Sequence, residues 1–277
     1  VRLVATSPAV VQICNRLDLD LVGICQSTSD LPERYDGVTT VGMAMNPDLE
    51  IIKSLDPDYI LSPATLQNDL QPKYASIGVS SLFLNLKSVE GMYASIGVSS
   101  LFLNLKSVEG MYASIEGLGE KFGREEEAAV MLEEFDSFMT EFAEKNAGKE
   151  SPKVLVLMGL PGSYIIATDN SYVGSLVKFA GGTNVYGDGD GQEFLFANTE
   201  DMKTKEPDVI LRAAHGLPDE ARKMFAEEFS TNDIWQHFKA VQEGRVYDLD
   251  SNLFNMSANF SYEEALKALQ PMLYGEE

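Results

Sequence analysis

Short apolar runs alternate with amphipathic stretches along most of the chain. This alternation is typical of strands that form a parallel sheet and of helices that cover both of its faces. In the first half it predicts, in order, strand 2–5, helix 8–17, strand 21–24, helix 47–55 and strand 59–62. In the second half it predicts strands at 153–158, 164–168, 209–212 and 245–249, and helices at 172–180, 199–205, 219–229 and 262–273. The pattern therefore predicts an α/β protein with Rossmann-like, mostly parallel sheets.

A long helical stretch, residues 124–146, separates the two alternating halves. Its apolar residues recur at helical spacing on one face: Leu132, Phe135, Met139 and Phe142. Glutamates occupy the opposite face, and a glycine and a proline shortly after the stretch end the helix. We therefore predict two lobes, 1–123 and 148–277, joined by one bridging helix at 124–147.

An identical internal repeat lies in the first lobe. Residues 74–92 recur unchanged as residues 93–111, and the word YASI appears a third time at 112–115. Two identical copies do not make a solenoid, which needs about three or more units. Each copy predicts one strand, at 79–86 and at 98–105, whereas the lobe needs only one. The extra strand is expected to bulge out, to displace its twin or to add to a sheet edge, and no function is assigned to it.

A second, weaker repetition relates the two halves at a constant offset of 150 residues. The run Asp56–Leu61 reappears as Glu206–Leu211, and the same offset maps Glu50 onto Glu200. In both places a helix is followed by a Pro-Asp corner and a buried strand, because proline cannot continue a helix. The two lobes therefore look like copies of one ancestral unit.

Charge and length restrict the class of function. The 277 residues include 21 basic and 43 acidic side chains, a net charge of −22, which repels phosphate backbones and excludes nucleic acid as a partner. The acidity serves either solubility or docking onto a basic partner. No apolar run reaches the roughly 18 residues of a membrane span. The first four residues indicate a strand and not a signal peptide, as in a mature secreted chain.

Few residues are candidates for chemistry. His215 follows a predicted strand and therefore belongs to a loop at a carboxyl strand end, where open α/β sheets bind ligands. His237 lies in a short helical turn and is expected to be a packing or surface residue. Met43 and Met45 flank Ala44 in a loop before a helix, so they are either soft ligands for a metal cofactor or core residues.

Enzyme motifs are missing. The run Gly159–Ser163 is not a nucleophile elbow, because its serine follows the second glycine. Gly187–Gly191 lacks the flanking strand and helix of a phosphate-binding loop. Cys14 and Cys25 form no CxxC motif, and Cys14 is expected to be a small core residue. We therefore predict a binding protein and not an enzyme; a metal-dependent hydrolase and a surface adhesin are the alternatives.

Several stretches give the chain a family resemblance. They are Arg2–Ser7, Leu31–Tyr35, Val41–Pro47, Met158–Tyr164, Ala167–Asp169, Ile210–Pro218, Asn232–Val241 and Val246–Leu249. With them the sequence resembles the haem-binding lipoproteins of Gram-positive iron-regulated surface systems, the IsdE type. These belong to the two-lobed, helix-bridged solute-binding proteins of ABC importers, which also carry siderophores and cobalamin.

The resemblance implies haem as the bound cofactor, with one axial iron ligand from each lobe. Matched by position, these ligands are Met45 and His215, and Met43 is a neighbour or a fallback ligand. The haem carboxylates are expected near backbone N–H groups of Ala9, Ser27 and Thr28. The sequence departs from the family at Pro8, which has no N–H.

The same resemblance implies further partners. Glu50 and Glu200 match the two carboxylates that pair with arginines of the membrane permease; otherwise they are solvated glutamates in first helical turns. The chain is expected at the outer face of the cell membrane, held by a lipid anchor, and supplied by upstream cell-surface haem-relay proteins. An iron–siderophore or cobalamin carrier of the same fold is the alternative.

Overall fold

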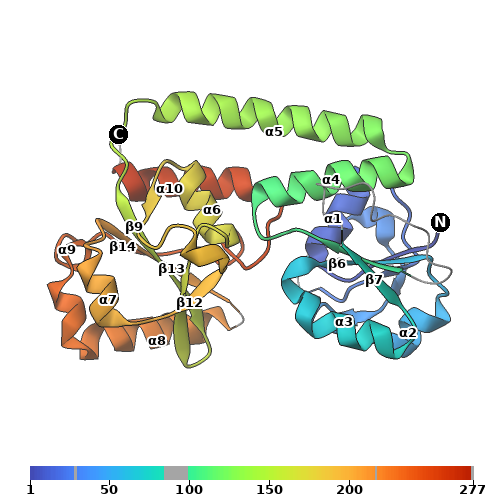
Figure 1. The fold of residues 1–277 in the computed structure, drawn as a ribbon, viewed down its shortest axis with the longest axis horizontal. Helices are drawn as coiled ribbons and strands as arrows, with labels where there is room; N and C mark the ends of the chain where they lie inside the picture. The colour runs from blue at the N-terminus through green and yellow to red at the C-terminus, as the bar shows by residue number, and fades with distance from the viewer. Residues whose placement is uncertain (28–29, 84–98, 216, 276–277) are drawn as a thin grey trace. The chain divides into compact units, whose positions relative to one another are not determined.

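The computed structural model describes residues 1–27, 30–83, 99–215 and 217–275. The chain forms two compact units (Figure 1). Unit 1 comprises residues 1–105 and 109–136, and unit 2 comprises residues 106–108 and 137–277. The boundary falls inside helix α5 (Glu125–Asn146), so both units contain part of this helix. Of the helices in the described residues, none is both long and apolar enough to cross a bilayer. The predicted division at residues 123 and 148 remains a prediction.

Unit 1 contains a parallel sheet with the strand order β3-β2-β1-β6-β8-β7. The strands are β1 (Leu3–Ala5), β2 (Gly23–Ile24), β3 (Thr39–Thr40), β6 (Tyr59–Pro63), β7 (Ser80–Phe83) and β8 (Ser99–Leu103). The helices are α1 (Pro8–Arg16), α2 (Leu49–Ser54), α3 (Gln67–Ser76) and α4 (Val108–Phe122), with 3₁₀ turns η1 (Glu33–Tyr35) and η2 (Ala64–Leu66). Within unit 1, α1 and α4 cover one face of the sheet, and α2 and α3 cover the other (Figure 1).

The start of α1 shows how local sequence sets these elements. The Ser7 side chain accepts the Val10 N–H at 3.4 Å, and Pro8 opens the helix with its backbone already constrained. The helix buries Val10, Val11, Ile13 and Cys14 completely. It ends before Asp18, whose φ of 53° is left-handed. The predicted core position of Cys14 is confirmed.

Unit 2 contains a mixed sheet with the order β12-β10-β9-β13-β14, and β11 also pairs with β9. The strands are β9 (Lys153–Leu160), β10 (Ser163–Ala167), β11 (Thr183–Asn184), β12 (Phe194–Phe196), β13 (Val209–Ala214) and β14 (Val246–Asp248). The helices are α6 (Tyr172–Phe179), α7 (Thr199–Thr204), α8 (Pro218–Thr231), α9 (Lys239–Gln242) and α10 (Tyr262–Tyr274), with 3₁₀ turns η4 (Gly189–Gly191) and η5 (Asp233–His237). Only the pairs of β10 are antiparallel. The predicted α/β class with mostly parallel sheets is confirmed.

The 150-residue repetition is visible in both units. Asp56 and Glu206 each adopt a left-handed backbone, with φ of 45° and 49°, just before the Pro-Asp corner. The following Asp58 and Asp208 carboxylates accept N–H groups at the starts of the first strands, from Arg2 at 2.6 Å and from Lys153 at 3.0 Å. The same corner therefore fixes the same strand pair in each half.

The identical 19-residue repeat is accommodated at the side of the unit 1 sheet. The second copy supplies β8, which lies between β6 and β7, and the first copy supplies β7. Of the three outcomes expected for the extra strand, the structure shows addition at the sheet edge, where the first copy forms β7. The predicted strand residues 84–86 and 98 lie outside the described residues.

Several regular elements were not predicted, among them α3, α4 and the hairpin of β4 (Gly42–Met43) with β5 (Asn46–Pro47). Helix α3 is rich in polar residues and contains Pro72, so it lacks a clear apolar stripe. Helix α4 begins inside the second copy of the repeat, where the strand prediction dominated. The hairpin is held by backbone contacts with distant residues, which no local pattern reveals.

The core of unit 2 contains the single tryptophan of the chain. Trp235 is completely buried and stacks on Phe229 with ring centroids 4.0 Å apart. The Glu228 carboxylate accepts hydrogen bonds from Trp235 Nε1 at 3.0 Å, Asn232 Nδ2 at 2.9 Å and Tyr164 Oη at 3.1 Å. Burial opposes ionisation of this carboxyl, but the three donors outweigh it, and the pKa of Glu228 lies below its usual value.

We predict that Glu228→Ala destabilises unit 2 by about 2–3 kcal/mol, because three donors lose a charged acceptor. A lowered carboxyl pKa contributes stability above the unfolded pKa, and this contribution is lost as the pH falls through the folded pKa. The difference between the two proteins should therefore shrink in acid. Urea unfolding followed by Trp235 fluorescence measures it. The exposed neighbour Glu227→Ala is the control, expected within about 0.5 kcal/mol of the parent; equal losses in both variants would contradict the role of Glu228.

Candidate functional site

The carboxyl ends of three parallel strands in unit 1 are level with one another. Ala5 lies opposite Ile24, and Ile24 lies opposite Thr40, so β1, β2 and β3 end at the same edge. The segments that follow these strand ends contain Ala9, Ser27, Met43 and Met45. The structure therefore brings these predicted site residues of the first half to one edge of one sheet. Thr28 lies outside the described residues.

Met43 and Met45 belong to the β4–β5 hairpin. Met43 pairs with Asn46, which leaves Ala44 and Met45 at the turn. The side chains of Met43 and Met45 are 63% and 59% exposed. The alternative that they are core residues is therefore wrong.

Two contacts hold the hairpin in place. The Gln26 N–H donates to the Gly42 carbonyl at 2.7 Å, and the Asp48 N–H donates to the Val41 carbonyl at 2.7 Å. Gly42 has a φ of +88°, and a Cβ there would lie 3.1 Å from the Asp48 nitrogen, so the position favours glycine.

Lys73 of α3 was not recognised from the sequence. Its ammonium group donates to the Met45 carbonyl at 3.0 Å and to Asn46 Oδ1 at 3.1 Å. It thus fixes the backbone of the turn while the Met45 thioether stays accessible. The residues are 28 positions apart, and no spacing rule connects a helical lysine with a distant hairpin.

The start of α1 offers a backbone donor for an anion. Ala9 is half-buried in the first turn of the helix, where a backbone N–H has no acceptor within the helix. Pro8 supplies no N–H, as expected, and the Ser7 hydroxyl is used as the helix cap. Ser27 is half-buried at the neighbouring strand end.

His215 lies at the carboxyl end of the unit 2 sheet. The backbone N–H of His215 donates to the Gly159 carbonyl at 2.9 Å, so His215 continues the pairing of β13 with β9 by one residue. The side chain is half-buried, and burial lowers the pKa of His215 below the usual 6.5. At neutral pH the imidazole is therefore uncharged and retains the lone pair that metal ligation requires.

Two exposed apolar side chains of unit 2 were also missed by sequence reasoning. Leu217 is 53% exposed, and Phe196 at the end of β12 is 96% exposed. The row Phe196, Ile165, Met158 and Ala213 runs straight across the sheet. Residues opposite one another share a face, so Phe196 and His215 lie on the same face of this sheet.

Glu50 and Glu200 occupy equivalent places in the two units. Each is exposed in the first turn of a short helix, α2 or α7. Asp48 caps the first helix by accepting the Glu50 N–H at 3.0 Å, and Asn198 caps the second by accepting the Asp201 N–H at 3.2 Å. Within the described part of the chain, no ion pair engages either glutamate.

Other potential metal ligands are unsuited to the task. Cys14 and Cys25 are buried free thiols, and burial raises the pKa of both to about 12, so neither forms a thiolate readily. Among the described residues, no group of three or more His, Cys, Asp or Glu side chains is placed to hold a metal ion. A bare metal ion therefore finds no ready cage in the described residues.

A family model for periplasmic binding proteins matches residues 3–253. The chain belongs to the periplasmic binding protein family. It is 39% identical over 274 residues to the high-affinity heme uptake system protein IsdE of Staphylococcus aureus, covering 99% of this chain and 87% of the relative.

Two solved structures are similar over nearly their whole length. One is an ABC transporter substrate-binding protein from Listeria monocytogenes, with 44% identity, a TM-score of 0.88 and 99% coverage of both chains. The other is S. aureus IsdE complexed with heme, with 39% identity, a TM-score of 0.86 and coverage of 99% and 98%. The resemblance drawn from sequence motifs is confirmed at the family level, and with it the prediction of a binding protein instead of an enzyme.

Proposed function

We propose that this chain is the extracytoplasmic solute-binding component of an ABC importer and that its cargo is haem. The observation that carries the proposal is the chemistry of two side chains at carboxyl strand ends: the exposed Met45 thioether in unit 1 and the neutral His215 imidazole in unit 2. The 39% identity to IsdE, a protein solved in complex with heme, supports the same cargo.

The donor set fits iron that arrives inside a porphyrin. A thioether and an imidazole form a known axial pair, which raises the reduction potential of haem iron. The four equatorial positions are then filled by the porphyrin, so the protein needs to supply only two ligands. This agrees with the lack of a larger ligand cluster among the described residues. Met43, on the same hairpin, is the fallback thioether.

Haem also carries two carboxylates. The Ala9 N–H at the start of α1 suits an anion, because helix N-termini present unpaired donors and a positive dipole end. Ser27 and Thr28, in the loop after β2, supply further donors in this proposal. Leu217 and Phe196 are available as apolar contacts on the His215 side.

The alternative cargo, an iron–siderophore complex, is less well served. Siderophore carriers tend to grip their ligand with arginines, and every arginine of this chain already has an acceptor. The pairs are Arg2 with Leu55 O, Arg16 with Glu134, Arg34 with Asp18 and Asp20, Arg124 with Asp18 O, Arg212 with Asp248, Arg222 with Asp219, and Arg245 with Leu273 O. The bidentate pair of Arg212 with Asp248, at 2.7 Å for both bonds, is especially committed.

Delivery requires a partner in the membrane. Glu50 and Glu200 are proposed to dock onto permease arginines, one from each unit, because both are exposed and equivalent by the 150-residue repetition. We further propose that a lipid anchor holds the protein at the outer face of the membrane and that cell-surface relay proteins supply the haem.

We predict that Met45→Ala and His215→Ala each weaken haem binding at least tenfold, about 1.4 kcal/mol, and change the position of the Soret band. Titration of the purified protein with haem, followed by absorbance, measures both quantities. Met43→Ala and His237→Ala are the matched controls, expected to stay within about twofold of the parent.

For the parent, the affinity for haem should be constant from pH 8 down to 6.5, since protons compete with iron for the imidazole only below the lowered pKa of His215.

Unchanged affinity and an unchanged Soret band in both ligand variants would refute axial ligation by these residues. Loss of affinity in Met43→Ala instead of Met45→Ala would move the ligand to its neighbour on the hairpin.

We predict that Glu50→Gln and Glu200→Gln each reduce haem-dependent ATP hydrolysis by the cognate permease about tenfold, because each removes one charge pair at the docking surface. Proteoliposomes that contain the permease provide the measurement, and the Soret band of the variants should equal that of the parent. Glu126→Gln and Glu144→Gln, two exposed glutamates of α5, are the controls. The docking role fails if control and test variants lose the same activity.

A further inference from the structure

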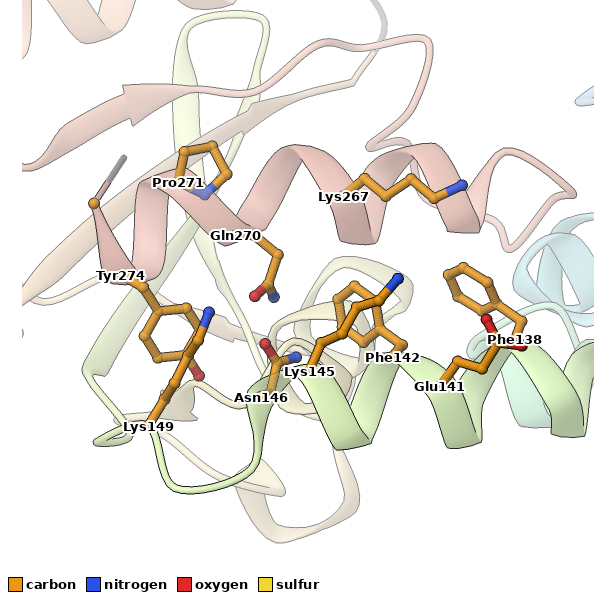
Figure 2. A pocket seen from close by; sticks show the side chains of 11 residues that line it. Phe138, Glu141, Phe142, Lys145, Asn146, Lys149, Lys267, Gln270, Pro271 and Tyr274 are labelled. Carbon is orange, nitrogen blue, oxygen red and sulfur yellow. The ribbon is translucent and has the colours of Figure 1, made fainter. Parts of the chain in front are cut away.

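A groove in unit 2 lies between the C-terminal half of α5 and α10 (Figure 2), and none of the residues that line it is assigned to haem. Its volume is about 580 Å³. Aromatic rings of Phe138, Phe142 and Tyr274 line it. A second cavity, of about 640 Å³, shares Lys149 and Tyr274 with the first.

The charge of this groove is opposite to that of the chain. Lys145, Lys149 and Lys267 line it together with one carboxylate, Glu141, whereas the whole protein carries −22. The Lys267 ammonium lies 5.4 Å from the Phe138 ring centroid, and the Lys149 ammonium lies 4.9 Å from that of Tyr274. Cationic groups therefore lie over aromatic rings contributed by both helices.

An orphaned amide also borders the groove. Both Asn146 side-chain polar atoms are buried, and among the described residues neither has a hydrogen-bond partner. Figure 2 shows the Asn146 and Gln270 side chains directed toward each other from α5 and α10. Gln270 and Tyr274 donate to the Ala180 carbonyl, at 3.3 Å and 3.1 Å, and neither forms a hydrogen bond with the Asn146 amide. Buried amides rarely remain unpaired in native proteins, so a missing partner is indicated.

We propose that this groove binds a small organic anion with a flat apolar body, of the aromatic carboxylate class. The rings provide surfaces for stacking, and Lys145 and Lys149 attract the anionic group. The Asn146 side chain turns from its buried position toward the ligand and supplies the donor and acceptor that lack partners. The site uses no residue of the haem proposal, so each stands or falls alone.

The test is isothermal titration of the full chain with 2-naphthoate, together with ligand-observed NMR. Saturable binding to the parent is expected, weakened at least tenfold in Lys145→Ala/Lys149→Ala and in Asn146→Leu. Lys223→Ala, an exposed lysine of α8, and His215→Ala should bind as the parent does. Unchanged Trp235 fluorescence and far-UV circular dichroism of the groove variants show that they are folded. Absence of saturable binding, or equal binding by parent and groove variants, overturns the proposal and leaves a water molecule as the partner of Asn146.

An independent observation concerns the identical repeat. In the β7–β8 pair, each residue lies opposite its own copy 19 positions later: Ser80 opposite Ser99, Ser81 opposite Ser100, Leu82 opposite Leu101 and Phe83 opposite Phe102. The second copy occupies the inner place beside β6, where Leu101 and Phe102 are 2% and 1% exposed. Because the copies are identical, the side chains that fill this place are available twice in one chain.

The first copy starts close to the place that it would fill. The first copy begins at Tyr74 in α3, and only Ile77, Gly78 and Val79 separate that helix from β7. Tyr74 is completely buried and already packs within unit 1, with its ring centroid 6.2 Å from that of Phe102. The first copy therefore starts next to the core that the second copy completes, and longer connections raise the entropic cost of closure only slowly.

We infer that either copy can fill the place beside β6, so that the first copy is a spare strand for the second. A charged side chain in a buried strand position normally unfolds the surrounding domain, because the charge loses its hydration without gaining a partner. Here Leu101→Asp should be tolerated, since the intact first copy takes over. The same substitution in both copies leaves no replacement.

Hydrogen exchange of β6, residues 59–63, is the measurement. Protection of these amides should fall less than about threefold in Leu82→Asp and in Leu101→Asp, but more than a hundredfold in the double variant. Deletion of residues 93–111, which yields the same chain as deletion of 74–92, should keep β6 protected and shows that one copy suffices. If Leu101→Asp alone abolishes protection as fully as the double variant does, the spare-strand inference is wrong.

Discussion

The parallel pairing of two central strands in each unit, β1 with β6 and β9 with β13, is the constraint on which the rest depends. It places the loops that follow these parallel strands at the same end of each sheet. In each unit an aspartate after the Pro-Asp corner accepts an N–H at the start of the first strand, so the pair is held at its amino end. The Met45 hairpin and the His215 loop both extend from the opposite, carboxyl ends, where backbone groups and side chains remain free to meet a ligand.

Some polar side chains of this protein stabilise the fold, and others are available to bind a ligand. The arginines are used for internal ion pairs and helix ends, and Glu228 serves the Trp235 cluster. The cysteines are buried and resist ionisation. The donors at the carboxyl strand ends are soft or neutral, the Met45 thioether in unit 1 and the His215 imidazole in unit 2. This division is consistent with a protein that holds a preformed iron complex and performs no reaction on it.

Two repetitions, one inexact and one identical, shape the chain. The 150-residue offset preserves geometry more strictly than sequence, since Asp56 and Glu206 differ in type but share a left-handed backbone. The 19-residue repeat preserves sequence completely and geometry only in part, because its two strands occupy inner and outer places of one sheet. A parallel sheet accepts such an insertion because its edge presents the same hydrogen-bonding pattern to each added strand.

The sequence by itself determined the α/β class, the order of most strands and helices, the family and the short set of candidate ligands, because strand and helix periods and Pro-Asp corners are local signals. Only the tertiary structure decided that Met45 is exposed on a clamped hairpin, that Lys73 holds it, that β10 runs antiparallel and that burial keeps His215 neutral. Each of these depends on contacts between residues distant in the sequence, and the free energy of such contacts is set by burial and register, which no local pattern contains.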